Sequence, residues 1–274
     1  MVYNPLLSII TPSYNQSNFI EQNIRSVKQQ TEDLNEEVEH IVVDGGSTDS
    51  TIDILEQYED DYKLRWVSEP DNGQSHAINK GIKMARGEWL GWQNSDDYYL
   101  EGSFEALRNA IQSSRQIDVL YGDVLIVDED GAVIDRRYMT KPSKFVQRYW
   151  SLFARNQATF FHRNCFKKLN GLNETLEYTM DAELFWQILN TDVDVTHVPR
   201  FLGAFRIQED AKTAGKLSND HIEERKKIYG EPWYEAVVPQ RALQTAARGL
   251  KLWYLLTEQR WEPIKYNLVN SIQG

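Results

Sequence analysis

The sequence predicts an α/β fold with a doubly wound, mostly parallel sheet, a small antiparallel addition and a helical C-terminal extension. In about the first 100 residues, a short apolar run, a polar loop and an amphipathic segment follow one another four times. That alternation is typical of parallel strands joined by right-handed crossovers. Two strand-like runs then flank a turn at residues 128–131, which predicts a hairpin. From Ser218 onward the pattern is mostly helical, with Pro232 and Pro239 as breaks.

The first half of the chain is expected to supply the parallel strands. Short runs of Val, Ile, Leu and Trp predict buried strands, and apolar residues at helical spacing predict the helices between them. Thr11-Pro12 is expected to end the first strand, because Pro12 fixes a local bend. The expected strands are residues 6–10, 38–43, 64–67 and 88–92, and the expected helices are residues 17–30, a segment containing Ile52, Ile54 and Leu55, residues 74–84, and a helix starting near Ser103.

The second half is expected to add antiparallel strands and further helices. Residues 119–127 and 132–135 make the two arms of the hairpin. Further strands are expected at residues 157–162 and 193–198, and a helix at residues 181–189. The chain is therefore divided into a sheet domain of residues 1–215 and a helical extension of residues 216–274.

Composition excludes several classes of protein. The net charge of −11 and the pI near 5.0 do not fit a nucleic-acid-binding protein, which normally carries a basic surface. Cys165 is the sole cysteine, which excludes an intrachain disulfide and a cysteine-based metal site. The N-terminus lacks the features of a signal peptide, and no apolar run reaches about 18 residues. These features predict a cytoplasmic protein.

Two adjacent carboxylates follow the fourth predicted strand. Asn94-Ser95-Asp96-Asp97 comes directly after the apolar run 88–92. Open α/β sheets bind ligands beyond the carboxyl ends of their strands. Mg²⁺ and Mn²⁺ take one or two protein carboxylates and fill their other positions with water and phosphate oxygens. The alternative is a solvated turn that caps the helix near Ser103.

Three further polar loops follow the other parallel strands. Thr11, Pro12 and Tyr14 lie in the first loop, where the ring of Tyr14 offers a surface for base stacking. Asp44 opens a glycine-containing loop and can accept a hydrogen bond from a ribose hydroxyl or a base N–H. Asp71, in the third loop, is a second candidate for nucleotide contact. Each loop also suits an ordinary turn or helix cap.

The familiar glycine motifs for phosphate binding are missing. The first strand–helix turn contains no glycine, so the G-x-G-x-x-G of a dinucleotide-binding fold is absent, and so is a P-loop. Backbone amides therefore do not provide the usual phosphate cradle. In an acidic chain, a metal ion at Asp96 and Asp97 becomes the natural counter-charge for a pyrophosphate.

The ordered set of loops resembles glycosyltransferase family 2. The resemblance covers about residues 5–215 and rests on segments 8–15, 41–49, 68–75, 77–81, 91–97, 156–161, 171–174 and 180–184. It implies a GT-A fold, a nucleotide-sugar donor and an inverting, metal-dependent reaction. No single segment is decisive, but five or more in the correct order form a strong signal.

The resemblance implies roles for individual residues. Asp96 and Asp97 match the aspartate motif that holds Mn²⁺ or Mg²⁺ on the donor pyrophosphate, with Asp96 also touching the nucleotide. Asp181 falls where the family keeps its catalytic base, and Glu183 is the nearest rival, on a different face of the same helix. The alternative for Asp181 is a carboxylate that stabilises a helix N-terminus. Lys212 matches a family lysine and is expected to pair with a phosphate.

Three positions depart from the family pattern. Many relatives have aspartate where Asn94 and Gly45 stand, and often histidine where Gln208 stands. The change at Gly45 shifts the expected nucleotide contacts to Asp44 and Asp71. The change at Gln208 removes a third protein ligand of the metal. His40, His162 and His197 are expected to be structural rather than metal ligands.

The expected function is sugar transfer from a nucleotide-sugar, a UDP-sugar by preference, to a hydroxyl of a saccharide or lipid-linked saccharide. Asp181 serves as the general base. One alternative is a catalytically inactive nucleotide-sugar-binding module, and another is a nucleotidyltransferase, which also places two carboxylates and a metal on an α/β sheet.

The last 34 residues are basic and aromatic. Residues 241–274 carry five cationic and two acidic residues, a net charge of +3, together with Trp253, Tyr254, Trp261 and Tyr266. Packing on the catalytic domain or on a second copy of the chain is the favoured interpretation. Peripheral contact with an anionic membrane that carries a lipid-linked acceptor is the alternative.

Overall fold

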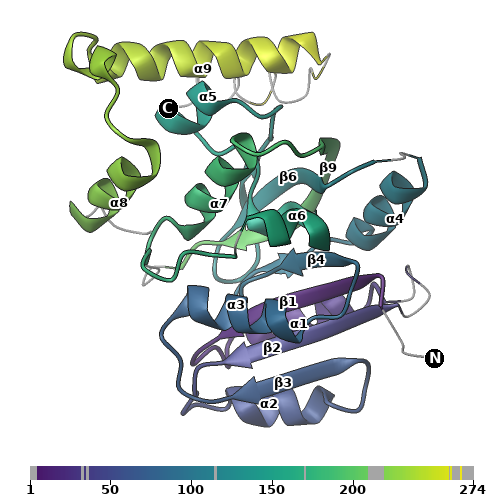
Figure 1. Cartoon of the computed structure of the whole chain (residues 1–274). Helices are drawn as coiled ribbons and strands as arrows, with labels where there is room; N and C mark the ends of the chain where they lie inside the picture. Colours follow the sequence, from purple (N-terminus) through teal and green to yellow (C-terminus); the bar gives the residue numbers. More distant parts are fainter. Residues whose placement is uncertain are drawn as a thin grey trace.

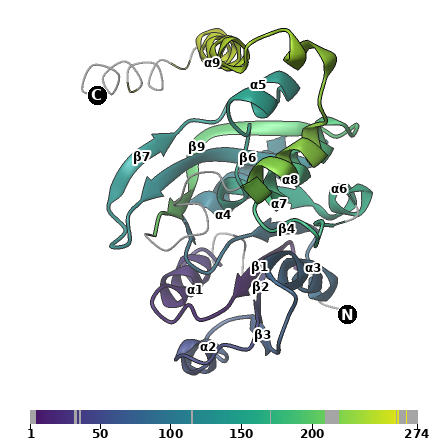
Figure 2. The same ribbon diagram turned by 90° about the vertical axis from the view of Figure 1, so that its left-hand side faces the viewer.

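A computed structural model describes residues 5–31, 34, 37–113, 116–169, 171–208, 219–258, 260 and 266. Within these ranges nine strands form one sheet in the order β3-β2-β1-β4-β8-β6-β9-β5, and β7 pairs with β6 (Figures 1 and 2). Four of the strand pairings are parallel and four are antiparallel. The predicted α/β class is confirmed, with the parallel pairings concentrated in the N-terminal half.

The N-terminal half alternates strands and helices as predicted. Its elements are β1 (Leu7–Ser13), α1 (Ile20–Lys28), β2 (Val38–Asp44), α2 (Thr51–Tyr58), β3 (Leu64–Ser68), α3 (Gln74–Met84) and β4 (Trp89–Trp92). On one face of the sheet, Ile78 of α3 packs in a cluster with Ile10 and Val43. On the other face, Ile24 and Leu55, from α1 and α2, pack against Val42. Helices therefore cover both faces of the parallel strands, because successive strand residues point to opposite sides.

The first strand does not end at Pro12, which corrects the prediction. β1 runs through to Ser13 and stays in register with β2, Pro12 lying opposite Val43. Its pairing with β4 ends earlier, at Ile10 opposite Trp92. Leu7 donates its N–H to the β2 side, so by alternation position 12 faces the β4 side. Pro12 therefore costs no ladder hydrogen bond, because β4 has already ended where its missing N–H would point.

The second half adds the antiparallel strands. Its elements are β5 (Tyr98–Tyr99), α4 (Ser103–Ser113), β6 (Val119–Val127), β7 (Val133–Arg137), α5 (Lys144–Tyr149), the 3₁₀ helix η2 (Asn156–Ala158), β8 (Thr159–His162), α6 (Arg163–Lys168), α7 (Met180–Leu189) and β9 (Val195–Arg206). The β6–β7 hairpin and α7 are confirmed. β9 is much longer than the predicted 193–198, because it pairs with β6 from Val195 to Arg206 and with β5 at Gly203 and Ala204.

One glycine sets how closely β9 approaches η2. A Cβ atom at Gly203 would lie 1.9 Å from the carbonyl oxygen of Gln157, so a larger residue does not fit. This close approach fixes the segment around Asn156 against the middle of the sheet. The sequence that follows the predicted late strand thus helps to place a loop that is distant in the chain.

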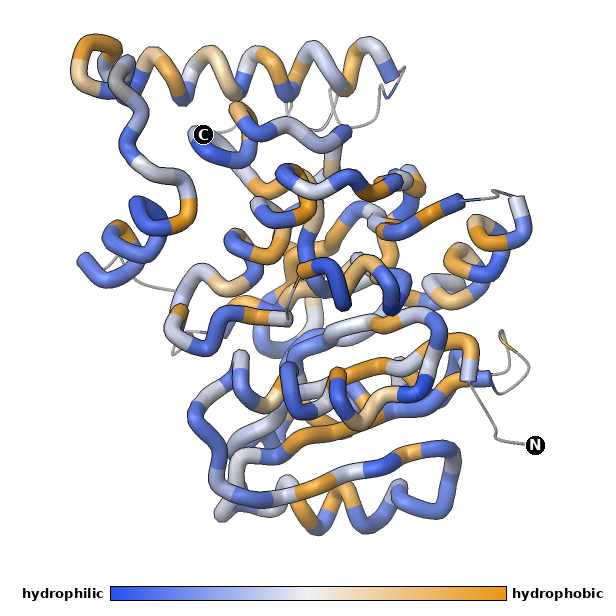
Figure 3. The backbone as a smooth tube through the Cα atoms, viewed as in Figure 1, coloured by the Kyte–Doolittle hydropathy of each residue, from blue (hydrophilic) through white to orange (hydrophobic). Residues whose placement is uncertain are grey.

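The C-terminal part is helical, as predicted, and contains α8 (Asn219–Tyr229), the 3₁₀ helix η3 (Trp233–Ala236) and α9 (Gln240–Thr257). α9 lies across α5 at the end of the molecule farthest from β3 (Figure 1), with Leu243 and Ala247 buried against Tyr149. Apolar and polar residues alternate around this helix (Figure 3). One face of α9 therefore packs on the sheet domain. The proposed boundary at 215/216 falls outside the described residues and stays a prediction.

Among the described helices, none is both long and apolar enough to cross a membrane.

Candidate active site

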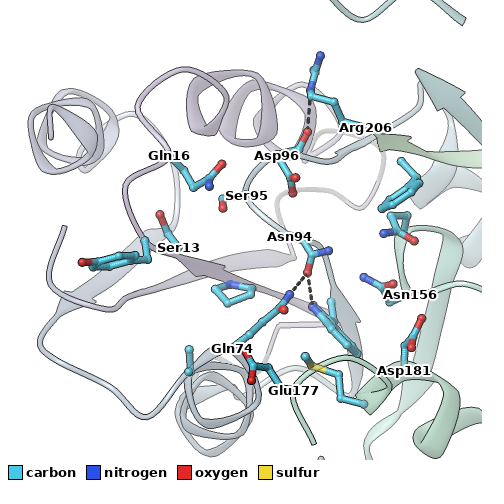
Figure 4. A pocket seen from close by; sticks show the side chains of 18 of the residues that line it. Ser13, Gln16, Gln74, Asn94, Ser95, Asp96, Asn156, Glu177, Asp181 and Arg206 are labelled. Carbon is cyan, nitrogen blue, oxygen red and sulfur yellow. Dashed lines mark hydrogen bonds between the residues drawn. The ribbon is translucent and has the colours of Figure 1, made fainter. Parts of the chain in front are cut away.

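A cavity of about 500 Å³ opens where the strand ends of the parallel sheet meet η2 and the start of α7 (Figure 4). Its lining comes from the first strand-end loop, the start of α3, the segment after β4, η2, α7 and the end of β9. The residues are Pro12, Ser13, Tyr14, Gln16, Asp71, Gly73, Gln74, Ala77, Trp92, Asn94, Ser95, Asp96, Arg155, Asn156, Gln157, Glu177, Tyr178, Met180, Asp181, Phe205, Arg206 and Gln208. Three of the four predicted strand-end groups thus reach one cavity.

The two adjacent aspartates point in different directions. Asp96 lines the cavity and accepts a hydrogen bond of 2.7 Å from Nε2 of Gln208. Asp97 is 1% exposed, and both of its carboxylate oxygens are already used, by the backbone N–H of Arg206 and by the amides of Gln157 and Asn94. The expected metal pair is therefore not presented together, because the turn closed by the Asp97 N–H and the carbonyl oxygen of Asn94 directs Asp97 inward and leaves Asp96 at the cavity.

Burial dominates the electrostatics of this pair. It raises the pKa of Asp97 well above its usual range, and the neighbouring Asp96 carboxylate adds to the rise. Burial also raises the pKa of Asp96, while the hydrogen bond from Gln208 and the charge of Arg206 act against it. Asp97 is therefore a structural carboxyl group, and Asp96 is the member of the pair that is available to a ligand.

Asn94 also has a structural task. Its Oδ1 accepts hydrogen bonds from Nε2 of Gln74 at 2.7 Å and from the indole N–H of Trp92 at 2.9 Å (Figure 4). Its Nδ2 donates to Asp97. Because both lone pairs of the amide oxygen are occupied, Asn94 fixes the floor of the cavity rather than supplying a metal ligand.

Besides Asp96, three of the predicted nucleotide contacts line the cavity. Pro12 lies in its wall, Asp71 is half-buried beside it, and Tyr14 is 59% exposed at its rim. A Cβ atom at Gly45 would lie 3.0 Å from Oδ2 of Asp71. Gly45 and Asp71 therefore compete for one space, and the glycine leaves room for the Asp71 carboxylate.

The other two described candidates for nucleotide contact do not line the cavity. Thr11 is buried, and its hydroxyl bonds Nε2 of His40 at 2.9 Å. Asp44 is buried too, and its carboxylate accepts hydrogen bonds from the N–H groups of Gly46 and Ser47 and from the hydroxyl of Ser68. Both side chains hold the strand ends in shape. Lys212 lies outside the described residues.

Asp181 lies in the first turn of α7 and faces the cavity. It is half-buried, and its Oδ1 accepts the N–H of Ala182 at 2.6 Å. Burial raises the pKa of Asp181, and the charge of Arg155 opposes that rise. Glu183 is not part of the cavity lining. Of the two acidic residues considered for the base, Asp181 is the one placed to meet a substrate.

A residue of α8 holds the loop that leads to Asp181, and no local sequence pattern marks this residue. The carboxylate of Glu224 accepts the backbone N–H groups of Glu177 and Tyr178 at 2.8 and 3.0 Å and the hydroxyl of Thr179 at 2.8 Å. Burial acts to raise the pKa of Glu224, but these hydrogen bonds outweigh it and lower the pKa overall. α8 thus supports the loop that precedes α7 directly.

Two arginines line the cavity, and the first, Arg206, is fully engaged. It is 2% exposed. Its guanidinium donates to the carbonyl oxygens of Asp96, Asp128 and Glu129 and to Oε1 of Gln22. These bonds tie the end of β9 to the segment after β4, to the β6–β7 turn and to α1. Arg206 therefore acts as a structural cross-link behind Asp96.

The second arginine, Arg155, is not engaged in this way. Its guanidinium makes no hydrogen bond or ion pair with any described residue and lies over the ring of Phe205, 5.4 Å from the ring centroid. Burial lowers the pKa of Arg155, and the charge of Asp181 opposes this shift more than any other group. Several other lining atoms, Ser13 Oγ, Gln16 Oε1, Asn156 Nδ2 and Gln157 Oε1, also lack a partner in the described part of the chain.

The sequence profile described as Glycosyl transferase family 2 matches residues 8–177. The chain belongs to glycosyltransferase family 2. An uncharacterised glycosyltransferase of Rickettsia typhi is 32% identical over 202 residues, which are 68% of this chain and 59% of that protein. Chondroitin synthase of Pasteurella multocida is 26% identical over 194 residues, 67% of this chain and 19% of that enzyme. The family 2 chain thus spans less than two thirds of the length of either relative.

Solved structures support the GT-A fold of this family 2 enzyme. S. aureus TarS 1–349 in complex with UDP-GlcNAc aligns with a TM-score of 0.65 and 19% identity, covering 86% of this chain and 69% of that one. Mannosyltransferase PcManGT from Pyrobaculum calidifontis, in complex with GDP-Man and Mn²⁺, aligns with a TM-score of 0.60 and 17% identity, covering 90% and 74%. At these identities the likeness concerns the fold alone.

The family implies a divalent cation, and the donor set allows one. The described residues contain no group of three or more His, Cys, Asp or Glu side chains that could hold a metal. Asp96 is a cavity-facing carboxylate with one hydrogen bond from Gln208, whose amide oxygen is left on the other side. One carboxylate and one amide oxygen suit Mg²⁺ or Mn²⁺, which complete their coordination with water and phosphate oxygens. A cation held this loosely needs the substrate to complete its site.

Proposed function

We propose that this glycosyltransferase moves a sugar from a UDP-sugar donor to a hydroxyl of a saccharide or a lipid-linked saccharide, with inversion at the anomeric carbon. The supporting observation is that Asp96 and Asp181, from different elements, line one cavity of about 500 Å³ on different sides (Figure 4). That spacing accommodates a donor diphosphate near Asp96 and an acceptor hydroxyl near Asp181.

The reaction needs one base and no enzyme nucleophile. The carboxylate of Asp181 takes the proton from the acceptor hydroxyl as its oxygen bonds to the anomeric carbon. The bond from that carbon to the phosphate oxygen breaks in the same step, and the nucleoside diphosphate leaves. Burial makes Asp181 more basic than a surface aspartate, while Arg155 favours its ionised form. α7 and the loop held by Glu224 orient the base.

Asp96 and Gln208 would hold the divalent cation. Such a cation, Mn²⁺ or Mg²⁺, neutralises negative charge on a diphosphate when it is bound. Tyr14 and Asp71 line the same cavity and would contact the base and ribose of the donor. Ser13 and Gln16, whose side-chain oxygens lack partners in the described part of the chain, add acceptors there.

A donor panel tests this proposal. Purified protein would be incubated with UDP-, GDP- and dTDP-sugars in the presence of Mn²⁺ or Mg²⁺, and release of nucleoside diphosphate would be measured with and without saccharide acceptors. We expect release of UDP from one UDP-sugar and its loss with EDTA. Release of pyrophosphate would indicate a nucleotidyltransferase, and donor binding without any turnover would indicate an inactive binding module.

We also propose that the outward face of α9 contacts an anionic membrane. Arg241 and Arg248 of α9 are exposed, and residues 240–257 contain no acidic residue, in a chain of net charge −11. Lys251 faces inward and donates to Ser151. Trp253 is 53% exposed there, and Leu256 is exposed beside it. Like charges on two such helices would repel a second copy, whereas anionic lipid complements them.

Co-sedimentation with vesicles tests this second proposal. We expect binding to vesicles of phosphatidylglycerol, weak binding to phosphatidylcholine, and loss of binding in a Trp253→Ser, Leu256→Ser variant. Val237→Ser, a change at an exposed residue outside α9, serves as the matched control. A concentration-dependent dimer that the same double variant disrupts would favour a second copy of the chain instead.

A further inference from the structure

Arg155 stands out because it is a half-buried cation with no ion-pair partner among the described residues. A charge taken from water normally gains hydrogen bonds or an opposite charge in return. Arg206, which lines the same cavity, meets that expectation with four acceptors. Arg155 contacts the ring of Phe205 and forms no hydrogen bond or ion pair among the described residues. Its five N–H donors therefore remain available on the cavity side.

Asn156 provides a second available donor next to Arg155. It is 4% exposed and lines the cavity on the same side as Asp181 (Figure 4). Its Nδ2 is buried and has no acceptor within the described residues. An arginine and an unpaired amide N–H in one wall form a donor set that suits a carboxylate or a phosphate.

The position of Arg155 favours the acceptor side of the cavity. Arg206 is the cation that acts on Asp96, where the donor diphosphate is expected. Asp181 is the carboxylate that acts most strongly on Arg155. The cavity therefore has one carboxylate–arginine set near the donor and another near the proposed base. The acceptor hydroxyl must reach that base, so the rest of the acceptor lies nearest to Arg155.

We propose that Arg155 and Asn156 form a subsite for an anionic group on the acceptor, so that the natural acceptor is an acidic glycan or a phosphate-bearing one. This rests on the proposed function, because it takes Asp181 as the base. The bidentate fork of Arg155 would receive two oxygens of the carboxylate or phosphate, and Asn156 would donate to one of them. The bound anion would also neutralise Arg155, and the acceptor hydroxyl would be positioned toward Asp181.

Protection of Arg155 from phenylglyoxal, followed by peptide mass spectrometry, tests the subsite without requiring turnover. The full chain would be saturated with UDP and Mg²⁺, and three probes that differ at C6 would be added: methyl glucuronide, methyl glucoside 6-phosphate and methyl glucoside. We expect Arg155 to stay reactive with UDP and Mg²⁺ alone. At least one charged probe should then slow its modification about tenfold more than the neutral probe does. The charged probe that protects identifies the source as carboxylate or phosphate.

Variants sharpen the same experiment. Arg155→Gln should abolish the preference for the charged probe in a binding titration and leave UDP affinity within about twofold, whereas Arg155→Lys should keep part of the preference. Arg200→Gln, at a half-exposed arginine paired with Glu105, is the charge-matched control and should change neither.

Protection by UDP and Mg²⁺ alone would overturn the proposal and assign Arg155 to the diphosphate. Equal protection by all three probes, or by none, would also overturn it. Failure of the wild-type protein to bind UDP would instead count against the proposed function.

Discussion

The two sides of the cavity differ in how completely their polar groups are satisfied. On the Asp96 side, Arg206 and Asp97 are buried and saturated with hydrogen bonds. On the Asp181 side, Arg155 and Asn156 keep unused donors. The hydrogen-bonded frame behind Asp96 is therefore complete before any ligand arrives, whereas Arg155 and Asn156 obtain acceptors only from what they bind. Substitutions on the first side should affect folding, and substitutions on the second should affect reaction.

The largest expected effect comes from removing the base. Asp181→Asn keeps the size of the side chain but cannot accept the acceptor proton, so kcat for transfer should fall about 10³-fold. UDP affinity and the free energy of unfolding should change little, because Asp181 makes one hydrogen bond to its own helix. Steady-state transfer assays and calorimetry with UDP and Mn²⁺ measure both quantities. Equal turnover by the variant would assign the base to another residue.

The next largest effect concerns the two arginines. Arg206→Met should lower the free energy of unfolding by roughly 3 kcal/mol, because it leaves three carbonyl oxygens and the amide of Gln22 without their donor. The matched variant Arg155→Met should change it by less than about 1 kcal/mol, since no hydrogen bond with a described residue is lost. Urea unfolding of the two variants provides the comparison. Similar losses of unfolding free energy in both variants would show that Arg155 supports the fold as much as Arg206 does.

A smaller effect is expected in the pH dependence of the free energy of unfolding, through the buried histidine next to Thr11. His40 is fully buried between Thr11 and the hydroxyl of Tyr62, and burial lowers its pKa to about 3. In the unfolded chain its pKa is about 6.5, so the unfolded state binds the extra proton first as the pH falls. His40 should therefore cost no stability above pH 6.5 and about 2 kcal/mol at pH 5, continuing toward pH 3.

Unfolding midpoints of wild type and His40→Gln at pH 7.5 and pH 5 measure this contribution. The variant is expected to be less stable at pH 7.5, because it loses the bonds to Thr11 and Tyr62, and to lose about 2 kcal/mol less than wild type on acidification. A parallel decline in both proteins would place the acid sensitivity at other groups.

The smallest effect should come from the α8 contact with the catalytic loop. Glu224→Gln keeps the shape but replaces one carboxylate oxygen with an N–H₂ group facing backbone N–H donors. We expect kcat to fall about tenfold with little change in UDP affinity, because the loop before Asp181 loosens. Glu223→Gln, on the same helix but exposed, is the control. A loss of UDP affinity as large as the loss of kcat would mean that the loop serves the donor side as well.

Much of the fold could be predicted because the patterns that mark its elements extend over many consecutive residues. The strand–helix alternation of the first half, the hairpin and the two proline breaks all occur where they were expected. β5, α5 and α6 were missed because two to six residues are too few to show a period. The full length of β9 depends on pairing with distant strands, which a local pattern does not contain.

The site was predicted in part, and the errors share one cause. Strand-end logic brought Asp71 and Asp96 to one cavity, and the family resemblance added Asp181, which lines the same cavity. It failed for Thr11, because neighbouring residues of a strand point to opposite sides. It failed for Asp97, because the turn after β4 directs that carboxylate toward Gln157 and the N–H of Arg206. The same applies to Asp44, whose loop turns its carboxylate inward.

The supporting residues were missed for a different reason. Arg206 and Glu224 act through backbone groups far away in the sequence, so no local motif marks them. Arg155 carried a usable signal, since it directly precedes the segment 156–161 that contributed to the family resemblance.

Pro12 has one more consequence for this enzyme. β1 remains joined to β2 as far as Ser13, while β4 leaves it after Trp92, so the sheet forks at this point. Pro12 on β1 and Trp92 at the end of β4 flank the point where the two strands separate, and both line the cavity. Any other residue at position 12 would present a backbone N–H where the two strands separate, and that donor would need water or another strand as its acceptor. Because Pro12 has no N–H, the point where the strands separate carries no unpaired backbone donor at this position.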